Sequence, residues 1–235
     1  MSILHQTYLT MHPRRFSAVL FVALFSILAY SVQGQDTTEQ VIYPIDIQGH
    51  TWQLTNLALT TFANGEAIPQ AETEEAWNLA AKEGTPAWCY YLNREDFGDK
   101  YGVLYNWYAV NDERGLAPKG WWIPTKVEFD SLCEAIGCNN IPIKLKAKGE
   151  WILSEGITNE SGFAALPAGS RTPGGEFLNA GVLDATLATG LESTAWWTAD
   201  QSSKGLCLCA FTHRNMGTSG CEKGLWLFCS LGESG

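Results

Sequence analysis

Ten tryptophans among 235 residues constrain this chain more than any other feature, because indole side chains bring large apolar areas that dominate core packing. Hydrophobic residues make up 46% of the sequence and charged residues only 17%. Collagen-like, disordered and coiled-coil chains need periodic glycine, few aromatics or many more charges. The sequence therefore predicts a globular protein.

The first 34 residues have the features of an export signal. Arg14 and Arg15 precede an uninterrupted run of apolar and small residues over positions 16–30. About fifteen residues suit the core of a signal peptide and are fewer than the roughly twenty that a spanning helix needs. We therefore expect a signal peptide over residues 1–34, with Met11 as an alternative start, and no membrane span after cleavage. An uncleaved membrane anchor is the other interpretation.

The remaining chain is expected to form a short polar tether, residues 35–41, and one domain, residues 42–235. About 200 residues are enough for a single domain that buries most of its unfolded surface. No repeat, low-complexity tract or long linker divides this part of the sequence.

The charge balance argues against nucleic-acid partners. Residues 1–34 hold two arginines and no acidic residue, so their removal changes the formal net charge from -10 to -12. Nucleic-acid binding needs a basic stripe, which is missing. Acidic residues collect over residues 42–81, where there is no lysine or arginine. They lack the spacing of a calcium loop, so we interpret them as a solvated face.

All seven cysteines follow the export signal, in the part of the chain that would reach an oxidising compartment. Disulfides are expected there ahead of zinc sites or catalytic thiols. The odd number leaves at least one thiol free, and the sequence does not fix the pairing. Cys207, Cys209, His213 and Cys221 depart from the spacing of structural zinc sites, so no metal site is predicted.

Two helices are predicted from their caps and apolar spacing. One spans Thr125–Ile136, where Thr125 and Glu128 form a T-x-x-E capping box and Gly137 ends the helix. Its apolar face has the i, i+3, i+4, i+7 pattern: Phe129, Leu132, Cys133 and Ile136. The other spans Glu74–Lys82, capped by Thr73.

Five segments are predicted as strands because they are apolar, rich in β-branched or aromatic residues, and bounded by Gly, Asn and Ser. They are Val41–Ile47, Ala87–Leu92, Ala195–Thr198, Leu206–Thr212 and Leu225–Leu231. The last two suggest a hairpin that would bring Cys207 or Cys209 near Cys221. Tyr101–Val110 fits either a strand or a buried helix, since periodicity does not decide between them.

Seven motifs, in order along the chain, carry a family resemblance. They are Trp52–Leu57, Thr61–Pro69, Pro86–Tyr91, Tyr101–Asp112, Gly115–Thr125, Asn159–Arg171 and Ala195–Thr198. This succession resembles the Fibrobacter succinogenes major paralogous domain, a family similar to C-type-lectin-like folds and to the sulfatase-modifying-factor superfamily. The resemblance implies an α+β, C-type-lectin-like fold, with two helices packed on a curled antiparallel sheet and long loops. It also implies a secreted or surface-attached bacterial protein.

The resemblance also bears on individual residues. Cys89 and Cys229 stand at family-like positions, which implies a disulfide between an early strand and the last one. By the same analogy residues 105–110 would belong to the first helix. The chain departs from the family at Trp122, where His is usual, and at Ala117, where many members have Cys, so no role is carried over there.

No catalytic residue or cofactor is predicted. His50 and His213 are the only histidines of the mature chain, and neither lies in a nucleophile-elbow or zinc-helix motif. Nucleotide-binding loops are missing, and no pair of carboxylates can be selected for glycoside hydrolysis. The cysteine pair of the sulfatase modifiers cannot be aligned, and the triplets of calcium-dependent lectins are missing.

The predicted ligand-binding residues are Trp122, Trp151, Arg171, Trp196 and Asp200. Tryptophans are rigid, amphipathic surfaces that stack on sugar rings or anchor peptides. Neighbouring residues in a strand point to opposite faces, so one Trp of each adjacent pair should be in the core and the other could be exposed. The alternative is that the tryptophans mainly pack the core and that Arg171 hydrogen-bonds the carbonyls of its own loop.

These observations predict a secreted or cell-surface, non-catalytic recognition domain that binds a glycan or a protein through loops after the second helix. One alternative is an extracellular enzyme that acts on polysaccharide or on protein side chains. Another is a structural surface protein without a small ligand.

Overall fold

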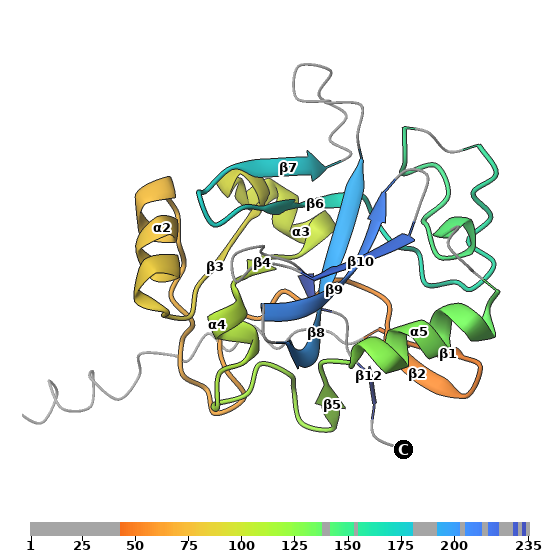
Figure 1. Ribbon diagram of the computed structural model, residues 1–235, viewed down its shortest axis with the longest axis horizontal. Coiled ribbons are helices and arrows are strands. Elements are labelled where there is room, and N and C mark those ends of the chain that lie inside the picture. Colours follow the sequence, from red (N-terminus) through yellow and green to blue (C-terminus); the bar gives the residue numbers. More distant parts are fainter. Residues whose placement is uncertain are drawn as a thin grey trace, which may run out of the picture. The chain divides into compact units, whose positions relative to one another are not determined.

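The computed structural model describes residues 43–137, 142–152, 155–180, 192–202, 205–212, 216–220, 228–229 and 232–233. All of them belong to one compact unit, residues 38–235. Within these ranges the protein is a mixed α/β fold with small sheets, few helices and no closed barrel (Figure 1).

A four-stranded sheet contains strands from both ends of the described chain. Its order is β1-β2-β12-β5, formed by β1 (Pro44–Ile47), β2 (His50–Gln53), β12 (Gly232–Glu233) and β5 (Trp121–Trp122). The β1–β2 hairpin turns at Gln48 and Gly49, whose φ angles of 56° and 81° are those of a two-residue type I′ turn. Gly232 pairs with Trp52 on one side and with Trp122 on the other, so β12 joins the hairpin to β5.

The larger sheet has the order β10-β9-β8-β6-β7, and β11 also pairs with β8. Its strands are β6 (Ala168–Arg171), β7 (Phe177–Ala180), β8 (Ser193–Ser202), β9 (Gly205–Thr212), β10 (Met216–Gly220) and β11 (Phe228–Cys229). The predicted strands at 195–198 and 206–212 lie within β8 and β9. The predicted hairpin of 206–212 with 225–231 is wrong, because β9 pairs with β10 and β11 runs parallel to β8. Residues 225–227 are outside the described ranges.

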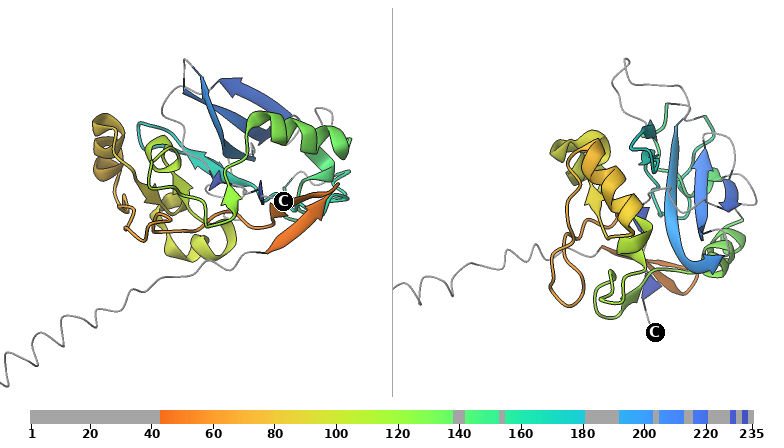
Figure 2. Two further views of the ribbon diagram at one scale, coloured as in Figure 1. Left: turned by 90° about the horizontal axis from the view of Figure 1, so that it is seen from below. Right: turned by 60° about the vertical axis from the view of Figure 1, so that its left-hand side comes forward.

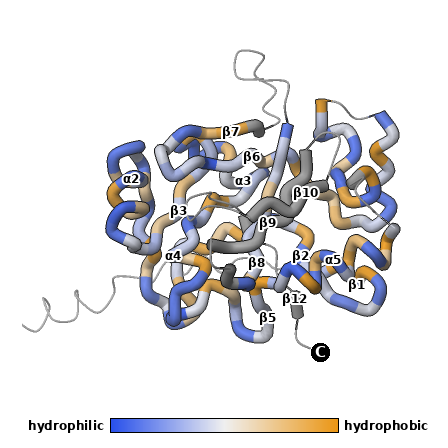
Figure 3. The backbone as a smooth tube through the Cα atoms, in the orientation of Figure 1, coloured by the Kyte–Doolittle hydropathy of each residue, from blue (hydrophilic) through white to orange (hydrophobic). Residues whose placement is uncertain are grey.

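The two predicted helices are confirmed. Helix α2 (Glu74–Glu83) has Thr73 as N-cap and ends at Gly84 in the left-handed conformation. Helix α5 (Lys126–Ala135) has the capping box of Thr125 and Glu128. In Figure 3 the tube of α2 changes between hydrophilic and hydrophobic colours, as expected of a helix with one buried face.

The ambiguous run 101–110 divides into three elements: the end of α3 (Gly98–Tyr101), β4 (Leu104–Tyr105) and α4 (Trp107–Val110). Gly102 ends α3 at φ 72°, and a Cβ there would lie 2.8 Å from the Leu57 carbonyl oxygen, so glycine is required. Asn106 then begins α4, since its side chain accepts a hydrogen bond from the Ala109 amide at 2.7 Å.

The predicted strand 87–92 is shorter than expected. Only β3 (Trp88–Cys89) forms, paired with β4. A 3₁₀ turn, η1 (Tyr91–Asn93), follows it, and its Leu92 and Asn93 have φ angles of 54° that end the strand. The other short elements are the 3₁₀ turns η2 (Glu95–Phe97) and η3 (Pro142–Lys144).

Two apolar clusters meet at β8. Trp196 belongs to a cluster with Phe129 of α5 and Phe163, whereas Trp197 belongs to one that contains Tyr105. Successive residues of a strand point to opposite faces, so both faces of β8 are covered. The views in Figures 1 and 2 show α5 beside the β1–β2 hairpin, and both elements contribute residues to the first cluster.

Candidate functional site

A hollow of about 190 Å³ lies between α5 and the four-stranded sheet. We call it the α5 groove. Its described lining residues come from β1 and β2, their turn, β5 and α5: Ile47, Gln48, His50, Thr51, Trp52, Trp122, Pro124, Glu128, Ser131, Leu132 and Ala135.

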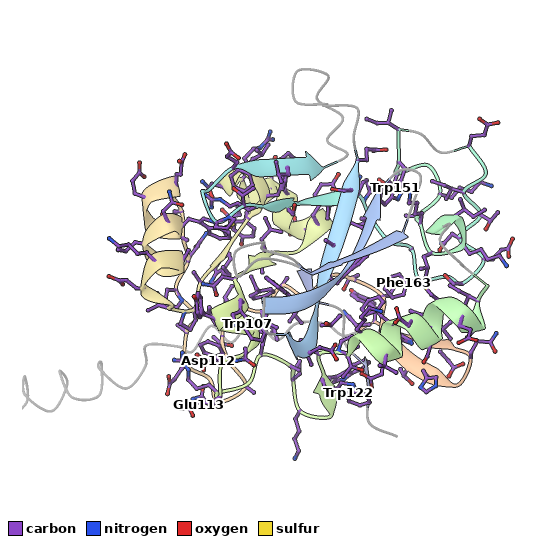
Figure 4. All side chains as sticks on the ribbon, in the orientation of Figure 1. Trp107, Asp112, Glu113, Trp122, Trp151 and Phe163 are labelled. Atoms are coloured by element: carbon purple, nitrogen blue, oxygen red, sulfur yellow. The ribbon has the colours of Figure 1, made fainter. Side chains whose placement is uncertain are left out.

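The start of α5 holds Trp122 in place on one wall of the groove (Figure 4). The Trp122 indole Nε1 donates a hydrogen bond to Glu128 Oε1 at 3.0 Å. The other carboxylate oxygen of Glu128 accepts from the Thr125 amide at 2.5 Å and from its hydroxyl at 2.8 Å. The residues that cap the helix therefore also orient the half-exposed Trp122 ring.

Trp52 contributes a buried hydrogen-bond donor that is unused within the described part of the chain. It is only 4% exposed, and its ring packs edge-on against Phe129 with centroids 5.2 Å apart. Its indole Nε1 has no hydrogen-bond partner among the described residues. An unsatisfied buried donor destabilises a protein by about 1–3 kcal/mol, so its presence in the groove wall calls for an explanation.

The groove carries little charge. Glu128 is the only carboxylate, and no lysine or arginine occurs, among its described lining residues. The remaining polar side chains are neutral hydroxyls, Gln48 and the exposed His50. A ligand with phosphate or carboxylate groups would find no lysine or arginine among these residues. The lining fits a neutral molecule with an apolar face and hydroxyl groups.

Two of the five predicted ligand-binding residues lie at the first turn of α5. Trp122 lines the groove, and Asp200 Oδ2 accepts a hydrogen bond from the Lys126 amide at 2.5 Å. An acidic side chain at a helix N-terminus stabilises the helix, so Asp200 has a structural role there. It does not line the groove.

Trp151 and Trp196 are buried. The Trp151 Nε1 donates to the Ala165 carbonyl at 2.9 Å, and the Lys146 ammonium lies 4.1 Å from its ring centroid. The Trp196 Nε1 donates to Asn56 Oδ1 at 3.0 Å. Trp151 is also far from Trp122 in Figure 4. Trp196 lines a separate hollow of about 420 Å³, but only 1% of the residue is exposed, and Trp151 is 3% exposed, so neither ring offers the open face that stacking on a ligand needs.

Arg171 is a core residue, 1% exposed. Its guanidinium lies between the rings of Trp77 and Phe177, 4.1 and 4.3 Å from their centroids. It donates to the Gly175 carbonyl at 3.0 Å and to the Asn93 side chain at 3.2 Å. The bond to Gly175 is the loop-carbonyl contact that the sequence offered as the alternative to ligand binding.

In each adjacent tryptophan pair the two rings point to opposite faces of their strand, but the two pairs differ in what covers those faces. Trp121 packs on the cluster of Trp197, whereas Trp122 lines the groove. Trp196 and Trp197 are both 1% exposed, because each face of β8 is covered by a cluster. The expectation that one Trp of each pair could be exposed is therefore wrong for the second pair.

The predicted Cys89–Cys229 disulfide is wrong, because Cys89 is a buried free thiol. Burial raises the pKa of this thiol to about 12, although the charge and a hydrogen bond of Arg171 oppose the rise. Cys89 thus packs beside Arg171 and does not serve as a link. The Cys209–Cys221 pairing involves side chains outside the described residues.

Sequence reasoning missed Trp52 and Ser131 as lining residues, and it treated His50 only as a catalytic candidate. The local signal was present, because His50 and Trp52 are two residues apart in a strand and so share a face. Nothing local indicated that α5 would cover that face.

The described residues contain no group of three or more His, Cys, Asp or Glu side chains that could hold a metal ion. Within the same ranges, no helix has the length and apolar character needed to cross a membrane.

The family model of the Fibrobacter succinogenes major domain matches residues 45–217. This range includes most of the groove, from the β1–β2 hairpin through α5. No curated protein and no solved structure matches the chain.

Proposed function

The chain belongs to the Fibrobacter succinogenes major domain family, and on that premise we propose that it is an exported, non-catalytic recognition domain that binds a neutral glycan in the α5 groove. We further propose that its mixed α/β fold is a variant of the C-type-lectin-like arrangement, with α2 and α5 as the two main helices.

The observation that carries the proposal is the pairing of Trp122 with Trp52. A half-exposed indole ring offers the apolar face of a sugar a surface to stack on. Trp52 lines the same groove, and its buried Nε1 has no hydrogen-bond partner among the described residues, so a hydroxyl oxygen that reached it would accept a hydrogen bond. A sugar ring has both features, and its hydroxyl would satisfy the buried donor.

Export is supported by two features. The sequence begins with a signal-like segment. Cys133 on the buried face of α5 is disulfide-bonded, as expected in an oxidising compartment. The cell surface or the surrounding medium is the proposed location.

A hydrolytic function is less well supported. Glycoside hydrolysis needs two carboxylates about 5–10 Å apart. Glu128 is the only carboxylate among the described lining residues, and it already accepts hydrogen bonds from Trp122 and Thr125. The groove therefore fits binding better than catalysis.

The test is binding of the mature chain to an array of neutral and acidic glycans, followed by calorimetric titration of the best neutral hit. We expect Trp122→Ala to weaken binding by at least about tenfold, the size typical of a central aromatic contact. Trp121→Ala is the matched control, because Trp121 lies next to Trp122 in β5 and is also partly buried, but packs against the cluster of Trp197 and does not line the groove. Its affinity should be close to that of the wild type.

Two results would contradict the proposal. One is a folded protein that binds no glycan on the array but captures a surface protein through the same groove. The other is an equal loss of affinity in both tryptophan variants, which would mean that the groove is not the site.

A further inference from the structure

A second hollow adjoins the α5 groove. It has a volume of about 440 Å³ and shares three residues with the groove, Ile47, Gln48 and Ala135. Its other described lining residues are Asp46, Ile136, Lys144, Glu160 and Ser161. Because they share these residues, the two hollows are neighbours, and we refer to them together as the depression.

The chemistry changes along this depression. The α5 groove has two tryptophans, whereas the second hollow has none and is mostly polar. The Lys144 ammonium pairs with Glu160 at 3.4 Å, and the Asp46 carboxylate accepts a hydrogen bond from the Gly49 amide at 3.2 Å, so the described lining holds one more acidic than basic side chain. The Ser161 hydroxyl donates to the Lys144 carbonyl at 2.7 Å and accepts from the Phe163 amide at 3.1 Å, which leaves one of its two lone pairs available. This lining offers hydrogen-bond partners for hydroxyl groups, and its one lysine is already paired with a carboxylate.

Gln48 stands where the two hollows meet. Its φ of 56° lies in the left-handed region, which glycine adopts readily and other residues rarely do. A type I′ turn favours Asn or Gly at this position. Strained residues of this kind cluster at functional sites, and the Gln48 carboxamide can both donate and accept hydrogen bonds in either hollow.

The volume of the α5 groove also indicates that a ligand longer than one sugar unit would extend into the second hollow. Its volume of about 190 Å³ is below the roughly 300 Å³ at which pockets for drug-sized ligands begin. One sugar ring on Trp122 would fill it. Any further unit would have to extend past Gln48 into the second hollow.

We infer that the α5 groove and the second hollow together form an extended site for a chain of neutral sugars, with one unit stacked on Trp122 and the next hydrogen-bonded around Gln48. The inference rests on the proposed function and adds that the ligand is an oligosaccharide of at least two units, so a monosaccharide should fill only part of the site.

The experiment is calorimetric titration of the mature chain with glucose and with gluco- and manno-oligosaccharides of two, three and four units, in α-1,4 and β-1,4 linkage. We expect the best disaccharide to bind at least about tenfold more tightly than glucose. Once the oligosaccharide fills both hollows, further units should increase the affinity little. A single affinity for all lengths would overturn the extended site while leaving glycan binding in the groove intact.

Gln48→Gly is the decisive variant, since glycine suits the turn and removes only the side chain. It should keep or raise the melting temperature and weaken binding of the disaccharide more than binding of glucose, so that the preference for the disaccharide falls several-fold. Gln70→Gly is the matched control at an exposed position outside both hollows. An unchanged length preference in Gln48→Gly would overturn the inference. Binding of no sugar by any form would overturn both this inference and the proposed function.

Discussion

The pairs Trp121–Trp122 and Trp196–Trp197 have the same two-residue pattern and opposite environments. β5 is the last strand of its sheet, and its Trp122 faces a groove. β8 is an interior strand, with β9 on one side and β6 on the other, and clusters cover both its faces. The position of a strand in its sheet, which the pattern does not encode, thus decides whether a paired tryptophan is buried in the core or lines a groove.

The hydrogen-bond partners of the rings differ in the same way. The Trp197 Nε1 donates to the Tyr105 carbonyl, and the Trp196 Nε1 donates to Asn56. Both partners are more than 90 residues away in sequence. The Trp122 Nε1 donates to Glu128, six residues further along the same chain segment. Buried rings therefore join distant segments, whereas the groove ring is held locally.

The largest effect that separates the two pairs should be on stability. We expect Trp196→Ala to lower the free energy of unfolding by about 3–5 kcal/mol, because it leaves a cavity beside Phe129 and Phe163. Trp122→Ala should lower it by about 1 kcal/mol or less, because that ring is only partly buried. Urea unfolding at neutral pH measures both. Equal losses would break the comparison.

A smaller effect concerns the buried region around Trp151. Burial lowers the pKa of Lys146 from 10.5 to about 8, and Glu192 acts in the opposite direction. The folded protein then releases this proton at lower pH than the unfolded chain. The contribution of Lys146 to the free energy of unfolding should therefore rise between about pH 8 and 10.5, by up to about 3 kcal/mol.

The measurement is the difference in unfolding free energy between wild type and Lys146→Met across this pH range. The difference isolates Lys146, because the opposing change from Cys89, whose pKa is raised, occurs in both proteins. A difference that stays flat from about pH 7 to about pH 10 would contradict the burial-driven shift. No such slope is expected from substitutions at the groove, where no lysine lines the described wall.

The smallest effect tests how the groove ring is held. Thr125→Ala should lower the unfolding free energy by about 1 kcal/mol, because the α5 cap is lost. It should also weaken glycan binding, since Glu128 loses a partner and orients Trp122 less firmly. Thr125→Ser keeps the hydroxyl and should restore both properties. Loss of stability without any loss of binding would show that the cap does not orient the ring.

Local signals in the sequence were enough to predict the helices that have capping residues and a periodic apolar face. The T-x-x-E box and the apolar spacing predicted α5, and the cap at Thr73 predicted the start of α2. The family could also be predicted from the sequence, because its motifs are short and ordered along the chain. The two-residue strand β12 gave no signal of its own, since its register depends on β2 and β5.

The site was less predictable for the same reason. Trp122 was selected because aromatic rings bind sugars, and it does line the groove. Arg171 was selected on equal grounds and lies in the core, because Trp77 and Phe177 enclose it from two other elements. Residue type suggests what a side chain can do. Only the packing of distant segments determines which side chains are exposed to do it.

The pairing of Gly232 with both Trp52 and Trp122 also affects the timing of folding. During synthesis the β1–β2 hairpin and β5 leave the ribosome early, but the strand between them is made more than 100 residues after Trp122. The four-stranded sheet cannot close until then. The groove wall should accordingly be among the last parts of the domain to form, and a nascent chain halted before Gly232 should fail to bind the ligand.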